Sequence, residues 1–196
     1  MKSFKQHIFE KLKVNKQVHT LFPKMKDELK QMIEDEISKN GNECSLNHID
    51  VSKITDMSRL FNYSKFNGDI SEWNVSNVEN MEYMFNESLF NRDISNWDVS
   101  NVENMKGMFG YSKFNGDISD WDVSCVTNMY DMFHGSIFNS DISNCNVSYV
   151  KDMRGMFYKS KFNGDISGWD VSIITNIHSM FVSSPLENNP PKWYKQ

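Results

Sequence analysis

The chain has 196 residues, of which 39% are hydrophobic and 24% charged, with a formal net charge of −5 at pH 7. This length fits one domain with a small appendage, and the composition excludes a collagen-like or disordered chain. No run of 18 apolar residues occurs, so we expect no transmembrane helix, and the excess of acid disfavours nucleic acid as a partner.

The first residues are charged throughout and lack the apolar core and cleavage site of a signal peptide. No Cys lies near the start, so we also expect no lipoprotein anchor. The chain has three Cys, and an odd, small count fits a reducing compartment. These observations predict a cytoplasmic location.

The N-terminal segment, residues 1–45, does not repeat, and it carries two amphipathic patterns. Apolar residues at spacing i, i+4 and i+8 from Phe4 predict a first helix of three turns. A second helix is predicted to begin near Pro23 and to stop at Gly41, since Pro favours a first turn and Gly ends a helix. We interpret the segment as a helical hairpin that caps the repeats. A partner-binding or membrane-surface helix is the alternative.

Residues 46–185 form about six repeats of 24 residues. One unit reads F-N-G-D-I-S-x-W-[ND]-V-S-x-V-x-N-M-x-x-M-F, followed by four residues that include a Ser. Residues at the same position in successive units are called a column here. Ten of the 13 Met and 11 of the 14 Phe fall in four columns, so the unusual composition of the chain is a property of the repeat.

A single unit cannot bury its own apolar side chains, but stacked units place like residues over like. Three columns are therefore predicted to build the core, with Cys145 in the one vacant Trp position. Their members are Phe66, Phe90, Phe114, Phe138, Phe162, Trp73, Trp97, Trp121, Trp169, Met84, Met108, Met132 and Met156.

Local spacing predicts the elements within each unit. The spacing I-x-x-W-x-V, as in Ile70, Trp73 and Val75, matches the strand of a leucine-rich-repeat unit. The steps of three in V-x-x-M-x-x-M-F favour a helical or 3₁₀ turn. The fold class predicted is a leucine-rich-repeat-like solenoid with a short parallel strand and a helical turn per coil.

The sequence M-x-x-M-F followed by F-N-x-D-I-S-x-W-D-V-S-x-V-x-N-M resembles the BspA-like leucine-rich-repeat proteins. More specifically, it is similar to the repeat first catalogued as a domain of unknown function in mycoplasma surface lipoproteins. The resemblance implies a solenoid used for binding and implies no catalytic residues. Characterised relatives are mostly surface proteins linked to adhesion and to binding of host proteins.

Two polar columns follow the core Phe. We predict that their side chains satisfy backbone groups in the turns, because Asn and Asp readily accept from nearby main-chain N–H groups. Binding of a divalent cation between coils is the alternative, since carboxylate oxygens suit Ca²⁺. The members are Asn67, Asn91, Asn115, Asn139, Asn163, Asp69, Asp93, Asp117, Asp141 and Asp165.

Residues 186–196 are predicted to be a degenerate C-terminal cap. Leu186 stands in the Phe column and Trp193 in the Trp column, whereas Pro190 and Pro191 replace Ile and Ser. Proline lacks the N–H that a backbone ladder needs, so it opposes further pairing.

No unique catalytic constellation is visible, because the Ser and Asp columns repeat and the His and Cys residues occupy unrelated positions. Specificity is expected in columns that vary between units. Seven variable residues are candidate partner contacts: Arg59, Tyr83, Tyr111, Tyr130, Lys151, Arg154 and Tyr158.

The function predicted from these observations is a non-enzymatic protein–protein interaction module without a cofactor or membrane insertion, monomeric or weakly oligomeric. One alternative is a binder of cations or small polar ligands through the Asp and Ser rows. The other is a host-directed adhesin, an effector or a phage-encoded inhibitor.

Overall fold

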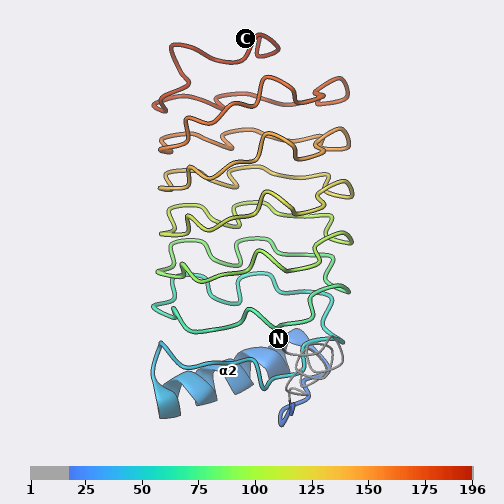
Figure 1. Cartoon of the computed structure of the whole chain (residues 1–196), viewed down its shortest axis with the longest axis vertical. Helices are drawn as coiled ribbons and strands as arrows, with labels where there is room; N and C mark the ends of the chain where they lie inside the picture. Colours follow the sequence, from blue (N-terminus) through green and yellow to red (C-terminus); the bar gives the residue numbers. More distant parts are fainter. Residues whose placement is uncertain (1–17, 196) are drawn as a thin grey trace, which may run out of the picture.

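The computed structural model describes residues 18–195 as a stack of coils above one helix (Figure 1). The helix, α2, spans Lys26–Asn40 and is the only regular helix or strand in the described part of the chain. The first helix of the predicted hairpin falls in residues 1–17, outside the described residues. From residue 46 onward each repeat forms one coil, which lies on the coil before it.

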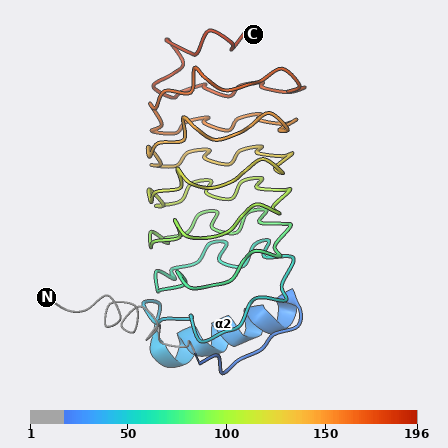
Figure 2. The same cartoon turned by 45° about the vertical axis from the view of Figure 1, so that its right-hand side comes forward.

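Helix α2 closes the N-terminal end of the stack, and Figure 2 shows it crossing beneath the first coil. Leu29 and Ile33 are buried on the side that joins the core. The helix begins shortly after Pro23. It stops as its sequence predicts, because Gly41 adopts φ 84° and its N–H donates to the carbonyl of Ile37.

A parallel backbone ladder joins each coil to the next. It runs through the ladder segment, which is residues 55–64 of the first coil and the equivalent residues of the others. The N–H of Met57 donates to the carbonyl of Asn80 in the next coil at 2.8 Å, and alternate N–H groups repeat this pattern up to residue 63. The same four bonds recur at all five coil interfaces. Isolated parallel bridges link one column: Asp56, Asn80, Asn104, Asn128, Asp152 and Asn176.

Two columns of the ladder segment have positive φ in all six coils. In the first coil these residues are Arg59 (φ 60°) and Tyr63 (φ 57°), and three later members are Gly. Each lies third in a four-residue turn, as the bonds from Leu60 N–H to the Met57 carbonyl and from Ser64 N–H to the Phe61 carbonyl show. A left-handed residue at this place is typical of a type II turn, and it stops the turn from continuing as a helix.

The strand predicted at Ile70, Trp73 and Val75 is not formed. These residues belong to two turns, closed by the bonds from Trp73 N–H to the Ile70 carbonyl and from Val78 N–H to the Val75 carbonyl. Here the indole replaces the backbone as the link between coils, because Trp97 Nε1 donates to the Ile70 carbonyl at 3.1 Å. The stretch V-x-x-M-x-x-M-F, predicted to form a helical or 3₁₀ turn, is the ladder segment. Its turns are closed by i→i+3 bonds, but the left-handed third residue prevents each turn from continuing as a helix.

The core consists of the side-chain columns that stacking brings together. Phe85 and Phe109 lie parallel with ring centroids 5.7 Å apart, and Trp73 and Trp97 with centroids 6.5 Å apart. All thirteen residues predicted to build the core are buried. The register continues past the last full coil, because Trp193 stacks on Trp169 and its Nε1 donates to the Ile166 carbonyl at 2.9 Å.

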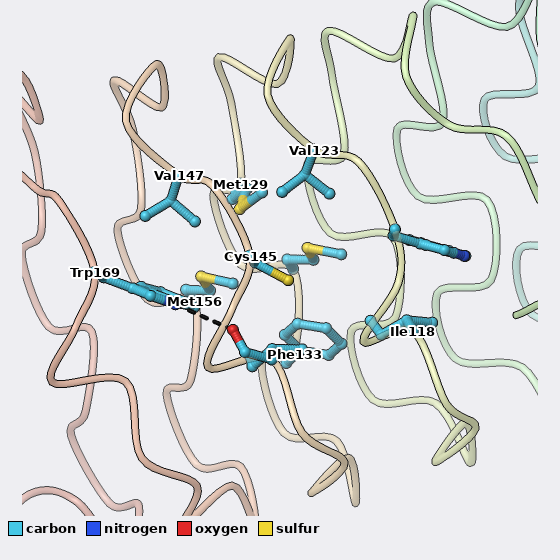
Figure 3. A pocket seen from close by; sticks show the side chains of 11 residues that line it. Ile118, Val123, Met129, Phe133, Cys145, Val147, Met156 and Trp169 are labelled. Atoms are coloured by element: carbon cyan, nitrogen blue, oxygen red, sulfur yellow. Dashed lines mark hydrogen bonds between the residues drawn. The ribbon is translucent and has the colours of Figure 1, made fainter.

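Cys145 interrupts the Trp column and leaves a cavity of about 20 Å³ (Figure 3). The cavity is lined by apolar side chains, among them Phe133, Met156 and Trp169, and the Cys145 thiol points into it. Burial raises the pKa of this thiol to about 11, so it stays protonated near neutral pH. The residue therefore acts as an undersized packing group.

Replacing the undersized side chain with the residue of its column, Cys145→Trp, is expected to raise Tm by about 2–4 °C. The indole would stack between Trp121 and Trp169 and donate to the Ile118 carbonyl, while flexible methionines around the cavity move aside. Thermal unfolding followed by circular dichroism measures the shift, with Cys145→Ala as the control that must lower Tm. A lower Tm for the Trp variant would show that the neighbouring side chains cannot reopen the cavity.

Candidate functional site

One face of the ladder segment carries a line of alternating cations and tyrosine rings. Its members come from the first five coils, and we call them the cationic–aromatic row: Arg59, Tyr83, Lys106, Tyr130 and Arg154. The Arg59 guanidinium lies 4.6 Å from the centroid of the Tyr83 ring, and Lys106 Nζ lies 5.3 Å from that centroid. Lys106 Nζ also lies 5.6 Å from the Tyr130 ring, which the Arg154 guanidinium approaches at 4.8 Å.

The row depends on local backbone features of the repeat. Tyr83 has φ 54° and extends over Gly107 of the next coil, where an added Cβ would collide with its ring. Gly107 itself has φ 60°, so glycine suits this position for two reasons. The next partner of the ring, Lys106, is therefore displaced by one residue from the column of Tyr83.

Acidic side chains flank the row and fix its cations. Glu82 lies 3.4 Å from Lys106 Nζ, and Asp152 holds Arg154 Nη2 at 2.7 Å. The hydrogen bond and charge of Asp152 raise the pKa of Arg154. The charge of Asp131 raises the pKa of Tyr130 further above physiological pH, where the hydroxyl is a neutral donor. The row thus offers rings and guanidinium groups without a large excess of either charge.

A second aromatic group, the tyrosine–histidine cluster, lies in the last positions of the ladder segment. It comprises Tyr111, His134 and Tyr158. The Tyr111 hydroxyl and His134 Nε2 are 2.8 Å apart, and the His134 ring lies 4.8 Å from that of Tyr158. His134 Nδ1 is 3.1 Å from Asp131, whose carboxylate orients the imidazole. Tyr111 is 51% exposed, which leaves a tyrosine face available to a partner.

The structure brings six of the seven candidate contact residues into these two groups. The exception is Lys151, whose backbone N–H donates to the Thr127 carbonyl and whose side chain has no contact with the row in the described part of the chain. The candidates omitted Lys106 and His134. Lys106 shares a column with Tyr130 and Arg154, and this shared column was the available signal.

The Asp column predicted above, and a second column that contains Asp122, form backbone caps. Oδ1 of Asp117 accepts from Ser119 N–H at 2.9 Å, and Oδ1 of Asp122 accepts from Ser124 N–H at 3.0 Å. The Asn column links coils instead, since Asn91 Oδ1 accepts the N–H of Asn115 in the next coil at 2.9 Å. These oxygens thus have main-chain partners. Among residues 18–195, no group of three or more His, Cys, Asp or Glu is arranged to hold a metal ion.

The stacked coils and their in-register columns define a repeat protein. Two overlapping stretches, residues 27–136 and 110–193, match the model of the family described as Mycoplasma protein of unknown function, DUF285. The chain belongs to this family, which confirms the resemblance to the mycoplasma repeat of unknown function. Neither the curated proteins nor the solved structures contain a match to the chain. None of the described helices has the length and apolarity needed to span a membrane.

The caps predict a defined response to acid. Hydrogen bonds from the Ser N–H two residues later lower the pKa of four aspartates: Asp93, Asp117, Asp141 and Asp165. A carboxylate with a lowered folded-state pKa stabilises the fold above its unfolded-state pKa, about 3.9, and this contribution disappears as the pH falls through the folded-state value. We therefore expect Tm to fall as the pH is lowered from about 5 to about 2.

The double variant Asp117→Asn/Asp141→Asn tests this origin. Its amide oxygens can still cap the turns, as Asn74 does for Ser76 N–H, but they lack the charge, so its Tm at neutral pH should lie slightly below that of the wild type. Its loss of Tm in acid should be smaller, because two titrating groups are removed. Equal acid losses for the two proteins, measured by thermal unfolding, would assign the pH dependence to other carboxylates.

Proposed function

We propose that this member of the family is a non-enzymatic protein-interaction module whose binding face is the cationic–aromatic row. The observation that carries the proposal is the continuous line of Arg, Tyr and Lys side chains across five coils. Tyr and Arg dominate the residues that supply binding energy at protein interfaces. A row that presents both from a rigid backbone has the composition of such a surface.

Pre-organisation supports the same proposal. Long cationic side chains lose about 0.5–1.5 kcal/mol of conformational entropy when a partner immobilises them. In the row, Arg154 is already held by Tyr130 and Asp152, and Lys106 by two rings and Glu82. Part of the ordering cost is thus met before binding. The side chain of Arg154 nevertheless remains 47% exposed, so that it can contact a partner.

The double variant Tyr130→Ala/Arg154→Ala tests the proposal. The tagged protein is used to capture partners from native host cells, and the captured proteins are quantified by mass spectrometry. Hot-spot truncations cost at least about 2 kcal/mol, so the variant should retain less than about one tenth of a specific partner.

Tyr149→Ala/Lys113→Ala is the matched control, because both residues are exposed and lie outside the row. It should retain nearly all of the partner. Unchanged capture by the row variant, or equal losses in both variants with unchanged Tm, would refute the row as the binding face.

A further inference from the structure

The last ladder segment, residues 175–184, has a free edge. In every earlier coil, four alternate N–H groups donate to the following coil. The equivalent groups here belong to Ile177, Ser179, Phe181 and Ser183. Ser183 N–H donates to Glu187 Oε2 at 3.0 Å, whereas the other three find no acceptor within residues 18–195. Three aligned main-chain donors therefore face away from the stack.

The residues that follow cover this coil only in part. Trp193 stacks on Trp169 and so continues the Trp column. Tyr194 then places its ring edge-on to Phe181, with centroids 4.8 Å apart. A groove of about 480 Å³ lies beside Tyr194, along the free edge, and Ile177 and Ser179 line it.

Five internal interfaces show what such donors bind. The N–H groups of Met153, Gly155 and Phe157, which precede the free edge by one coil, donate to the carbonyls of Asn176, His178 and Met180. The acceptor in each interface is thus a stretch of two successive turns with the motif [ND]-M-x-x-M-F or a close variant, running parallel. Its first Met covers the residue below it, and Met129 and Met153 are buried in this way. Ile177, in the same column, is only partly buried and has no such cover.

We propose that the free edge binds a segment of another polypeptide that carries the [ND]-M-x-x-M-F motif and adopts the two-turn conformation of the internal ladder segments. The segment supplies carbonyls to Ile177, Ser179 and Phe181 and an apolar side chain to Ile177. This mode is strand addition to an open edge, in which main-chain bonds give affinity and side-chain pockets give selectivity. The edge lies outside the cationic–aromatic row. Each surface can therefore be tested separately, and loss of binding at one does not imply loss of binding at the other.

A second copy of the chain cannot supply this segment by stacking its own first coil. Helix α2 lies beneath that coil (Figure 1), and Lys26 Nζ bonds to Asp56 and Ser58 at its ladder segment. The motifs of the later coils are enclosed on both sides by their neighbours. The occupant is therefore a segment whose carbonyl edge is not already covered.

The experiment uses the full chain, labelled for amide hydrogen exchange by NMR, and a synthetic peptide with the sequence of residues 103–112, ENMKGMFGYS. In the free protein, the amides of Ile177, Ser179 and Phe181 should exchange faster than those of Met153, Gly155 and Phe157. Saturating peptide should slow exchange at the free edge at least about tenfold, since a hydrogen-bonded amide exchanges only on opening.

Two matched controls distinguish recognition of the motif from non-specific association with the peptide. In the peptide, Val in place of the residue equivalent to Gly107 should weaken binding at least about tenfold, because a β-branched residue opposes the required positive φ. In the protein, Ile177→Lys should weaken binding by a similar factor. Ile173→Lys, an exposed position of the same coil outside the groove, should leave it unchanged.

Three outcomes would overturn the proposal. One is an absence of protection at millimolar peptide in a protein with an unchanged melting curve. Another is equal binding of the Val-substituted peptide. The third is protection of the same three amides without peptide that grows with protein concentration, which would assign the edge to a second copy of the chain.

Discussion

The backbone ladder imposes the constraint on which the other features depend. Each donor in the ladder segment meets a carbonyl at a fixed position of the next coil, as Met57 meets Asn80 and Arg59 meets Glu82. The coil must therefore keep a fixed length, because one inserted residue would shift every later donor away from its acceptor. Fixed length is also what places Phe over Phe and Trp over Trp. The columns of the core are thus a consequence of the hydrogen-bond register as much as of apolar burial.

The ladder also explains why its outward-facing side chains vary. Two columns require positive φ in every coil, yet residues as different as Arg59, Glu87, Asp131 and Gly155 occupy them. A left-handed conformation costs a non-Gly residue about 1–2 kcal/mol, which the ladder bonds and core must offset at each position. Once this cost is met, the side chain is constrained only where a neighbouring side chain lies close to the backbone, as the Tyr83 ring does at Gly107. The side chains in these columns and in the neighbouring columns can therefore differ between coils and contact a partner. The residues of the cationic–aromatic row belong to these columns.

The sequence predicted the core columns and the capping columns because both keep the same register through all the repeats. It did not predict the location of the ladder, since I-x-x-W-x-V and M-x-x-M-F are both apolar and both could form strands. The deciding facts are the turn at Trp73 and the bond from the Trp97 indole to the Ile70 carbonyl of the preceding coil, neither of which has a signature in spacing. Gly107, Gly135 and Gly155, isolated in otherwise variable columns, were the one local sign of positive φ.

The candidate site was predictable only in part, because the sequence shows columns but not the contacts between neighbouring columns. Tyr130 and Arg154 were found because their column varies, but the row also steps between columns. The step from Tyr83 to Lys106 is one residue shorter than a full repeat, as is the step from Tyr111 to His134, whereas columns contain only steps of a full repeat. The shorter steps arise because Gly107 and Gly135 have no side chain, and the tyrosine rings of the coil below lie over them. Positions of this kind become visible only when backbone geometry is known.

Substitutions that interrupt the repeat make some parts of the stack less stable than others. In an array where each unit contacts only its neighbours, stability is close to a sum over interfaces. Cys145 removes one indole bond and three ring contacts where the fifth coil meets the fourth and sixth, although the backbone ladder there is complete. The last two coils are therefore the part of the stack that opens at the lowest free energy. Since the free edge belongs to the same part, a segment bound to this edge would stabilise those coils most.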